Sequence, residues 1–344
     1  MKSILRAAVL TAGLIGAASA QAETLIGSGA SFPFPLYSAW FKDFSSNNDM
    51  GVRVDYQSKG SGAGINDLIN KVVDFAGSDA AMTDEEIAKV EGGVVLLPMT
   101  AGEIVIAYNL KGVDQLKLSR EAYCQIFLGN VEKWNDPIVA KTNAGVKLPD
   151  TKITTVVRSD SSGTTFNFTN HLADICQDFK AGPGAGKSVQ WPGVPNIVKA
   201  PKNDGVTATI KQTPGAIGYI EYGYAKLTKT PTAMLENKAG NFVEAGSEAG
   251  AAALASASGD FDGYMRAFVT DPAGDKSYPM ATFTWMLFYK QYDSKEKVEA
   301  IKAMLEYCLT KGQDAADKYG YIPLPEAVIT KVRAEAEKIG AAGM

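Results

Sequence analysis

The sequence predicts an α/β protein of two domains with largely parallel sheets. Apolar, strand-like runs alternate along the chain with segments of helical periodicity, which is the pattern of consecutive β–α–β units. The chain has 344 residues, which is more than one hydrophobic core usually organises. Two domains are therefore the expected arrangement.

The first 22 residues have the composition of a secretory signal peptide. Lys2 and Arg6 form a basic start, residues 7–18 are apolar or small, and Ala20-Gln21-Ala22 is an A-x-A cleavage signal. The apolar segment is too short to span a membrane, and no Cys at the cleavage site offers a lipid anchor. We expect cleavage after Ala22 and a soluble product in the periplasm.

The expected strands are short runs rich in β-branched and aromatic residues, bounded by turn residues. They fall at residues 52–57, 74–77, 94–97, 104–108, 153–157, 216–220 and 282–289. Proline, glycine and small residues interrupt the pattern at residues 98–102 and precede the last strand at residues 277–281. Both breaks are predicted hinges between the domains.

The expected helices begin at recognisable capping residues. Pro33 suits the first turn of a helix that runs to about residue 46, Thr83 with Glu86 makes a capping box for a helix to about residue 91, and Ser119 caps a helix through residue 128. Further helices are expected at residues 65–73, after Thr164, at 294–309 and at 326–339. The Gly/Pro/Lys-rich residues 181–204 are predicted to be a loop, and the Ala/Gly/Ser-rich residues 240–260 allow no assignment.

Charge and reactive side chains argue against several classes of function. Loss of two basic residues with the leader lowers the formal charge from −4 to −6, so we expect no nucleic-acid binding. Cys124, Cys176 and Cys308 are widely spaced, form no metal-ligand cluster and allow at most one intramolecular disulfide. His171 is the one histidine, and a packed or solvated helix residue is its expected role. Transition-metal and Ser-His-Asp chemistry therefore have little support.

The segment from Arg158 to Thr165, with the sequence RSDSSGTT, has the features of an anion site. It follows a strand-like run and precedes the start of a helix, whose first N–H groups lack intrahelical partners and favour negative charge. Ser162 and Thr164 add hydroxyl donors, Gly163 allows close backbone approach, and Arg158 offers a planar fork of donors. Asp160 can orient that guanidinium. The alternative is an ordinary polar turn followed by a helix cap.

Two more Ser/Gly-rich helix entrances follow strand-like runs earlier in the chain. The first is residues 27–33, GSGASFP, where Ser31 suits a cap, and the second is residues 60–64, GSGAG, which contains Ser61. A simple cap can account for the first, but three glycines in the second exceed what a cap needs and suggest close approach to a ligand. Because ligands of open α/β sheets bind beyond the carboxyl ends of strands, the three entrances can converge on one small anion.

Asp79 is an unexpected residue at such a site, because it places a carboxylate just after the short strand at residues 74–77. A carboxylate beside an anion is repulsive unless the anion carries a proton to donate. A generic turn aspartate is the alternative.

Residues 181–188, AGPGAGKS, resemble a relaxed nucleotide-binding P-loop with alanine in the first glycine position. A true P-loop follows a buried strand and opens a helix, whereas Trp191-Pro192-Gly193 follow here almost at once. We therefore expect no nucleotide binding by this segment.

Together these motifs resemble the periplasmic phosphate-binding proteins of ATP-driven phosphate importers. The resemblance covers nearly the whole chain after the leader and is carried by residues 24–33, 74–79, 158–164, 214–219 and 319–325. It implies a two-lobed, Venus-flytrap fold with two crossover strands and phosphate in the cleft. One lobe would be residues 23–98 plus 280–344, and the other residues 99–279.

The resemblance also implies which residues hold the ligand. Matched position by position, the contacts would be Ser31, the main-chain N–H of Phe32, Ser61, Asp79, Arg158, Ser162, Gly163 and Thr164. Asp160 would be the partner that holds Arg158. The three cysteines are outside the family pattern.

The predicted function is capture of inorganic phosphate and its delivery to the membrane permease subunits of an ABC phosphate importer. We expect a monomer that is not an enzyme and needs neither a cofactor nor a metal. One alternative is a secreted phosphatase or other hydrolase with Ser162 as nucleophile, which would need a base or a metal. Another is a binder of sulfate or molybdate, which Asp79 disfavours because those anions carry no proton at neutral pH.

Overall fold

The structure is a computed structural model that describes residues 23–257, 259 and 261–342. The expected signal peptide lies outside the described residues. Within them, no helix is long and apolar enough to cross a membrane.

The main sheet has eight strands in the order β2-β1-β3-β11-β4-β8-β6-β7. The strands are β1 (Thr24–Gly29), β2 (Arg53–Ser58), β3 (Phe75–Ser78), β4 (Val94–Tyr108), β6 (Thr154–Arg158), β7 (Ile197–Ala200), β8 (Ala216–Glu221) and β11 (Ala281–Tyr289). Strands β1, β2 and β3 are mutually parallel, and so are β6, β7 and β8. The expected α/β fold with largely parallel sheets is confirmed, with two antiparallel strands, β4 and β11, between the parallel groups.

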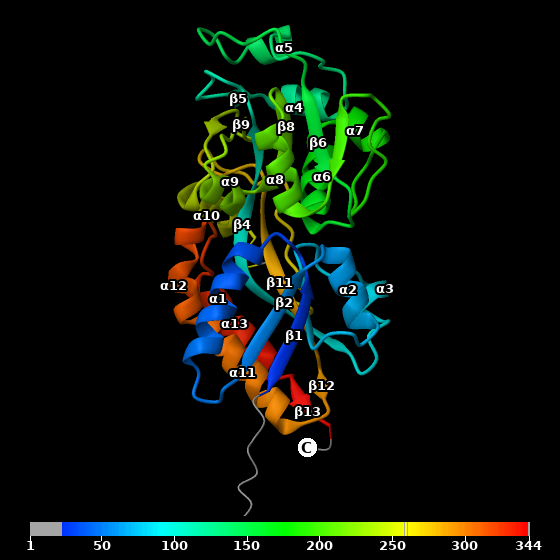
Figure 1. Cartoon of the computed structure of the whole chain (residues 1–344), viewed down its shortest axis with the longest axis vertical. Helices are drawn as coiled ribbons and strands as arrows, with labels where there is room; N and C mark the ends of the chain where they lie inside the picture. The colour runs from blue at the N-terminus through cyan, green and yellow to red at the C-terminus, as the bar shows by residue number, and fades with distance from the viewer. Residues whose placement is uncertain (1–22, 258, 260, 343–344) are drawn as a thin grey trace, which may run out of the picture.

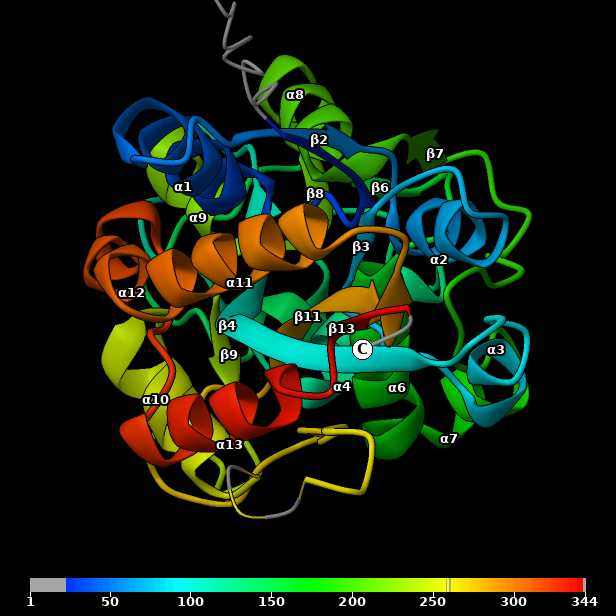
Figure 2. The same cartoon turned by 90° about the horizontal axis from the view of Figure 1, so that it is seen from below.

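Two groups of helices accompany the two groups of parallel strands (Figure 1). With β1–β3 lie α1 (Phe34–Asn47), α2 (Ser61–Ile69), α3 (Asp84–Ile87), α11 (Lys295–Leu309), α12 (Lys311–Ala315) and α13 (Glu326–Ala336). With β6–β8 lie α4 (Arg120–Phe127), α5 (Pro137–Ala140), α6 (Gly163–Ile175), α7 (Gln177–Ala181), α8 (Lys202–Gln212), α9 (Tyr222–Thr228) and α10 (Ser247–Ala255). In the first group, α11, α12 and α13 lie on the side opposite α2 and α3 (Figure 2).

The remaining elements are short. They are β5 (Lys117–Leu118), β9 (Met234–Glu236), β10 (Phe242–Val243), β12 (Gln291–Tyr292), β13 (Gly340–Ala341) and a 3₁₀ turn at Asp317–Tyr319. Strands β10, β9 and β5 form a small sheet, and β12 pairs with β13.

Strand β4 is continuous where the sequence predicts two strands separated by residues 98–102. Pro98 lacks the N–H of a regular ladder, and it is accommodated at a register shift between Thr284 and Trp285 of β11. Residues 94–103 of β4 pair with β11, and residues 104–108 pair with β8. The predicted interruption of the strand is therefore wrong, and β4 joins both groups of parallel strands.

Other boundaries differ from the prediction for local reasons. Helix α2 begins at Ser61 rather than at residue 65, so the glycine-rich segment is part of the helix, and α3 ends at Ile87. Residues 181–204 contain β7 and the start of α8 rather than only a loop, and residues 247–255 form α10. The predicted capping box of Thr83 with Glu86 and the predicted cap at Ser119 are confirmed.

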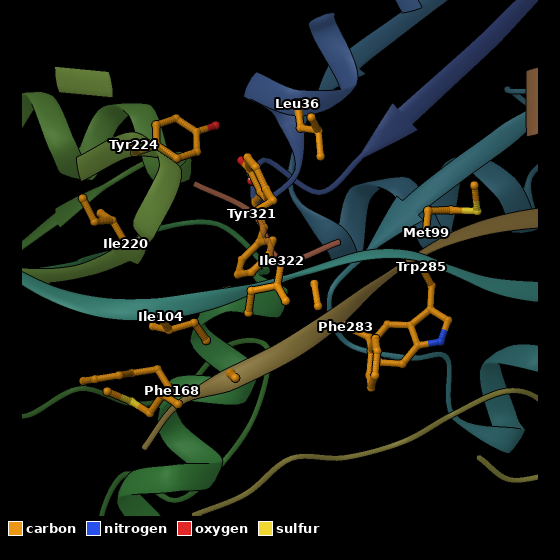
Figure 3. Close-up of a cluster of buried hydrophobic side chains, with 14 of the residues drawn as sticks. Leu36, Met99, Ile104, Phe168, Ile220, Tyr224, Phe283, Trp285, Tyr321 and Ile322 are labelled. Carbon is orange, nitrogen blue, oxygen red and sulfur yellow. Dashed lines mark hydrogen bonds between the residues drawn. The ribbon is translucent and has the colours of Figure 1, made fainter. Parts of the chain in front are cut away.

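Buried apolar residues from both groups of strands form one cluster around β4 and β11. Figure 3 shows its central part, where side chains from the two crossover strands meet others from β8, α1, α6 and the chain near residue 321. The residues labelled there are Leu36, Met99, Ile104, Phe168, Ile220, Tyr224, Phe283, Trp285, Tyr321 and Ile322. A disulfide between Cys124 and Cys176 links α4 to the end of α6, while Cys308 is free and buried.

Candidate functional site

The carboxyl ends of both groups of parallel strands face the middle of the molecule. Strands β1–β3 run in the same direction as β4, because β3 is antiparallel to β11 and β11 is antiparallel to β4. Strands β6–β8 run in the opposite direction, because β8 is antiparallel to the far end of β4. The two sets of strand ends therefore point toward each other, and this is where α/β proteins bind ligands.

Helices that follow these strands begin at the same place. Helix α1 follows β1, α2 follows β2, α6 follows β6 and α8 follows β7. The sequence predicts three of these helix entrances, and the structure adds the N-terminus of α8. Each contributes backbone N–H groups without intrahelical partners and the positive end of a helix dipole.

On the side of β6, Arg158 is buried and held by Asp160 in a two-pronged ion pair. The guanidinium Nε donates to Asp160 Oδ1 at 2.8 Å and Nη2 donates to Oδ2 at 2.6 Å. Burial favours a raised pKa for Asp160, but the bonds from Arg158 and from the Lys202 N–H hold that pKa below its usual value. Asp160 and Arg158 thus form the pair that the sequence predicts. The third guanidinium nitrogen, Nη1, donates to Thr164 Oγ1 at 3.3 Å.

Helix α6 begins directly beside this ion pair. Ser162 is its N-cap, with Oγ accepting from the Thr165 N–H at 3.0 Å. Gly163 and Thr164 follow as its first helical residues, and all three are buried. A Cβ on Gly163 would lie 2.5 Å from both Ser61 Oγ and Asp79 Oδ2, so only glycine fits here.

On the side of β1–β3, Ser31, Phe32, Ser61 and Asp79 lie at or just after the strand ends and are buried. Ser31 does not cap α1 as predicted, because Pro33 occupies the cap position and makes no side-chain bond there. Its hydroxyl instead contacts α8 across the molecule. The carbonyls of Ser31 and Phe32 accept bonds from Tyr224 (2.5 Å) and Tyr321 (2.6 Å). These tyrosines fix the turn between β1 and α1.

The two sides are in direct contact through the predicted residues. Ser61 Oγ accepts from the N–H of Gly163 at 3.1 Å and from the N–H of Asp79 at 3.3 Å. Thr164 Oγ1 donates to Asp79 Oδ2 at 3.4 Å. All eight residues predicted as ligand contacts are thus buried at the facing strand ends.

Asp79 is 2 % exposed, and its Oδ1 has no hydrogen-bond partner among the described residues. Burial raises the pKa of this carboxyl to about 7, although Arg158, Thr164 and Ser61 act to lower it. A buried carboxylate with an unused oxygen, surrounded by donors, can accept a proton-bearing group and repel a fully deprotonated one.

The sequence did not predict the role of Asn203, which is fully buried at the start of α8. Its backbone N–H and side-chain Nδ2 donate to Ser31 Oγ at 3.1 and 3.0 Å, and Nδ2 also donates to Thr164 Oγ1 at 3.1 Å. The available signal was the short run at residues 196–200 followed by Pro201, a strand followed by a residue suited to a helix start. The glycine and proline content of the region concealed it.

The side chains that a hydrolase would use as a base or as metal ligands do not gather at this site among the described residues. His171 is buried in α6, its Nε2 lies 2.7 Å from the Tyr123 hydroxyl, and burial lowers its pKa to about 4. The predicted packed role of His171 is confirmed. In the P-loop-like segment, the Lys187 carbonyl accepts from the Ser162 N–H at 2.8 Å, and the Lys187 ammonium pairs with Glu86. No group of three or more potential metal ligands occurs among the residues that the structure describes.

Comparison with known proteins first identifies the class of protein to which the chain belongs. A family profile described as a PBP superfamily domain matches residues 16–311. Solved structures agree on the fold. A high affinity periplasmic phosphate-binding protein bound with phosphate superposes with a TM-score of 0.73 at 22% identity, covering 90% of this chain and 93% of the other. A phosphate-binding protein from Stenotrophomonas maltophilia has a TM-score of 0.70 at 24% identity, with 91% and 93% covered.

Sequence relatives then define the family. The phosphate-binding protein PstS of Pasteurella multocida is 39% identical over 321 residues, which are 93% of this chain and 91% of the relative. The PstS of Haemophilus influenzae is 37% identical over 318 residues, covering 92% and 93%. The chain belongs to the PstS family of phosphate-binding proteins.

Proposed function

We propose that this protein captures inorganic phosphate in the periplasm and delivers it to the permease subunits of an ABC phosphate importer. One observation carries the proposal: buried donors from both groups of strand ends meet around Asp79, a buried carboxylate with one oxygen unpartnered among the described residues. The donors can form hydrogen bonds to the phosphate oxygens. The carboxylate can accept a hydrogen bond from the P–OH group that phosphate keeps near neutral pH. Relatives that share most of the chain are named phosphate-binding proteins.

The proposed ligand contacts are those that the sequence predicts. They are Ser31, the N–H of Phe32, Ser61, Asp79, Arg158, Ser162, Gly163 and Thr164, with Asp160 as the support of Arg158. The proposed lobes are residues 23–98 plus 280–344 and residues 99–279, with β4 and β11 as the crossover strands between them. Each lobe would then supply part of the site, and phosphate would hold the lobes together.

We also propose that the protein is a monomer that has no catalytic activity and needs no cofactor or metal. Ser162 supports this because its hydroxyl oxygen caps α6, and the one histidine contacts Tyr123 instead. A secreted phosphatase is therefore the weaker candidate, and phosphate esters should not be turned over.

Isothermal titration calorimetry on ligand-stripped protein tests the proposal. We expect one phosphate per chain to bind tightly and sulfate to give little heat under the same conditions. A phosphomonoesterase assay on the same preparation should show no activity. Absence of phosphate binding, or an esterase activity that is lost in Ser162→Ala, would refute the proposed function.

A further inference from the structure

Asn203 contacts hydroxyls that come from the two opposite sides of the site. Ser31 follows β1, whereas Thr164 lies in the first turn of α6. The Asn203 amide nitrogen lies 3.0 Å from Ser31 Oγ and 3.1 Å from Thr164 Oγ1. This one side chain therefore connects two residues that we propose as ligand contacts.

The orientation of the Asn203 amide is fixed by a separate bond. Its Oδ1 accepts from the Glu221 N–H at 2.9 Å, and a backbone N–H can only donate. The oxygen must therefore point toward Glu221, and the NH₂ group must point toward the two hydroxyls. The side chain is fully buried, so water does not compete for these positions.

The bonds to Ser31 and Thr164 determine how their hydroxyl groups can act. A hydroxyl has two acceptor lone pairs and one proton. Ser31 Oγ accepts from the backbone N–H and the Nδ2 of Asn203. Thr164 Oγ1 accepts from Arg158 Nη1 and from Asn203 Nδ2. Both lone pairs of each oxygen are thus occupied, and each hydroxyl has only its proton left to donate. In Thr164 that proton is directed at Asp79 Oδ2, at a distance of 3.4 Å.

We propose that Asn203 is a positioning residue that makes the Ser31 and Thr164 hydroxyls donors only. Ser31 then presents its proton to the bound anion, and Thr164 exchanges its long bond to Asp79 for one to the anion. This inference rests on the proposed phosphate site and adds a residue to it. Asn203 acts through the two hydroxyls rather than by contact with phosphate. Asn203 can make both bonds only when the two sides of the site are together, because Ser31 and Thr164 belong to different sides.

Phosphate titrations of single and combined variants test this role. Asn203→Ala removes the two bonds from Nδ2 to the hydroxyls and the bond that Oδ1 accepts from the Glu221 N–H. The loss frees one lone pair on each hydroxyl, so we expect phosphate affinity to fall by about 5- to 100-fold. In a Ser31→Ala/Thr164→Val background the hydroxyls are absent, and the same substitution should change affinity by less than about threefold.

Asn109→Ala is the matched control, because Asn109 Nδ2 also makes two bonds, to the Ile210 and Lys211 carbonyls at the opposite end of α8. It should leave phosphate affinity within about twofold of wild type. The inference is overturned if Asn203→Ala binds like wild type, or if its loss is undiminished in the background without the hydroxyls. The second outcome would mean that Asn203 only places α8.

If Asn203→Ala does not fold, Asn203→Asp replaces it. The aspartate retains an acceptor for the Glu221 N–H but offers the hydroxyls an oxygen instead of donors, so we expect a larger affinity loss than about 100-fold. Wild-type affinity in Asn203→Asp would overturn the inference. The wild-type titration separates the two proposals. If the wild type does not bind phosphate, the proposed function fails and the inference fails with it, whereas phosphate binding by the wild type that Asn203 substitution leaves unchanged overturns the inference alone.

Discussion

The two sides of the site differ in how their charges are balanced. On the side of β6, Arg158 and Asp160 neutralise each other in a two-pronged pair, and the helix entrance adds donors. On the side of β1–β3, Asp79 is a buried carboxylate with one oxygen unpartnered among the described residues. We propose that the first arrangement attracts any small oxyanion, whereas the second, when Asp79 is ionised, favours an anion that carries a proton. We infer that the Arg158 side supplies binding strength and the Asp79 side supplies selectivity.

The largest expected effect is that of Arg158→Ala. The change removes a buried cation and leaves Asp160 unpaired near the anion, a loss of roughly 2–5 kcal/mol or about 30- to several-thousand-fold in phosphate affinity. Arg158→Lys should restore only part of it, because a point charge cannot reproduce the fork. Calorimetric titration measures both.

Arg120→Ala is the control for this change. Arg120 makes a similar two-pronged pair with Asp271 at the start of α4, at 2.6 and 2.8 Å. It should leave phosphate affinity nearly unchanged. A loss of less than about threefold in Arg158→Ala would mean that the cation contributes little to binding strength.

Asp79→Asn should change selectivity more than phosphate affinity. Sulfate resembles phosphate in size but has no proton at neutral pH, so an ionised Asp79 repels it in a desolvated site. Sites built around a required hydrogen bond can reject a ligand lacking it by about 10⁴–10⁵. An amide can also donate, so phosphate binding should survive while the ratio of phosphate to sulfate affinity falls. If that ratio is unchanged, donor geometry rather than Asp79 discriminates between the anions.

The charge of Asp79 should also affect stability in the absence of phosphate. Burial raises the pKa of its carboxyl from 3.8 to about 7, so between these values the folded protein binds more protons than the unfolded chain. Its contribution therefore becomes less favourable as pH rises through this window. Thermal unfolding should show wild type losing stability relative to Asp79→Asn from about pH 4 to about pH 7. A constant difference between the two proteins would indicate a normal pKa.

The smallest expected effect concerns the ion pairs that join the two sides outside the anion site. Lys187 pairs with Glu86, and Arg266 Nη1 contacts Asp84 Oδ1 at 2.8 Å. Such partly exposed pairs contribute at most about 1 kcal/mol and weaken with salt. Lys187→Met should therefore weaken phosphate binding by less than about fivefold, with a smaller effect at high salt. If Lys187→Met lowers phosphate affinity as much as Arg158→Ala does, these outer ion pairs matter as much as the buried site.

The sequence predicts the parts of this site whose signals are local. Arg158, Asp160 and Ser162 lie within five consecutive residues, and their roles follow from a strand end, a charge pair and a helix cap. Asn203 was missed because its role depends on a short strand hidden in a glycine- and proline-rich region and on a partner, Ser31, far away in the chain. Likewise, Pro98 suggested a break in β4. The register shift that accommodates it, where Trp285 pairs with Pro98 and Thr284 with Thr100, is visible only once β4 and β11 are paired.

We propose that one phosphate is held between the two sides of the site and draws them together. Small-angle X-ray scattering of ligand-stripped protein, with and without saturating phosphate, tests it most directly. We expect a smaller radius of gyration with phosphate and no comparable change with an equal concentration of sulfate. An unchanged radius of gyration in a sample that calorimetry shows to be saturated would contradict it.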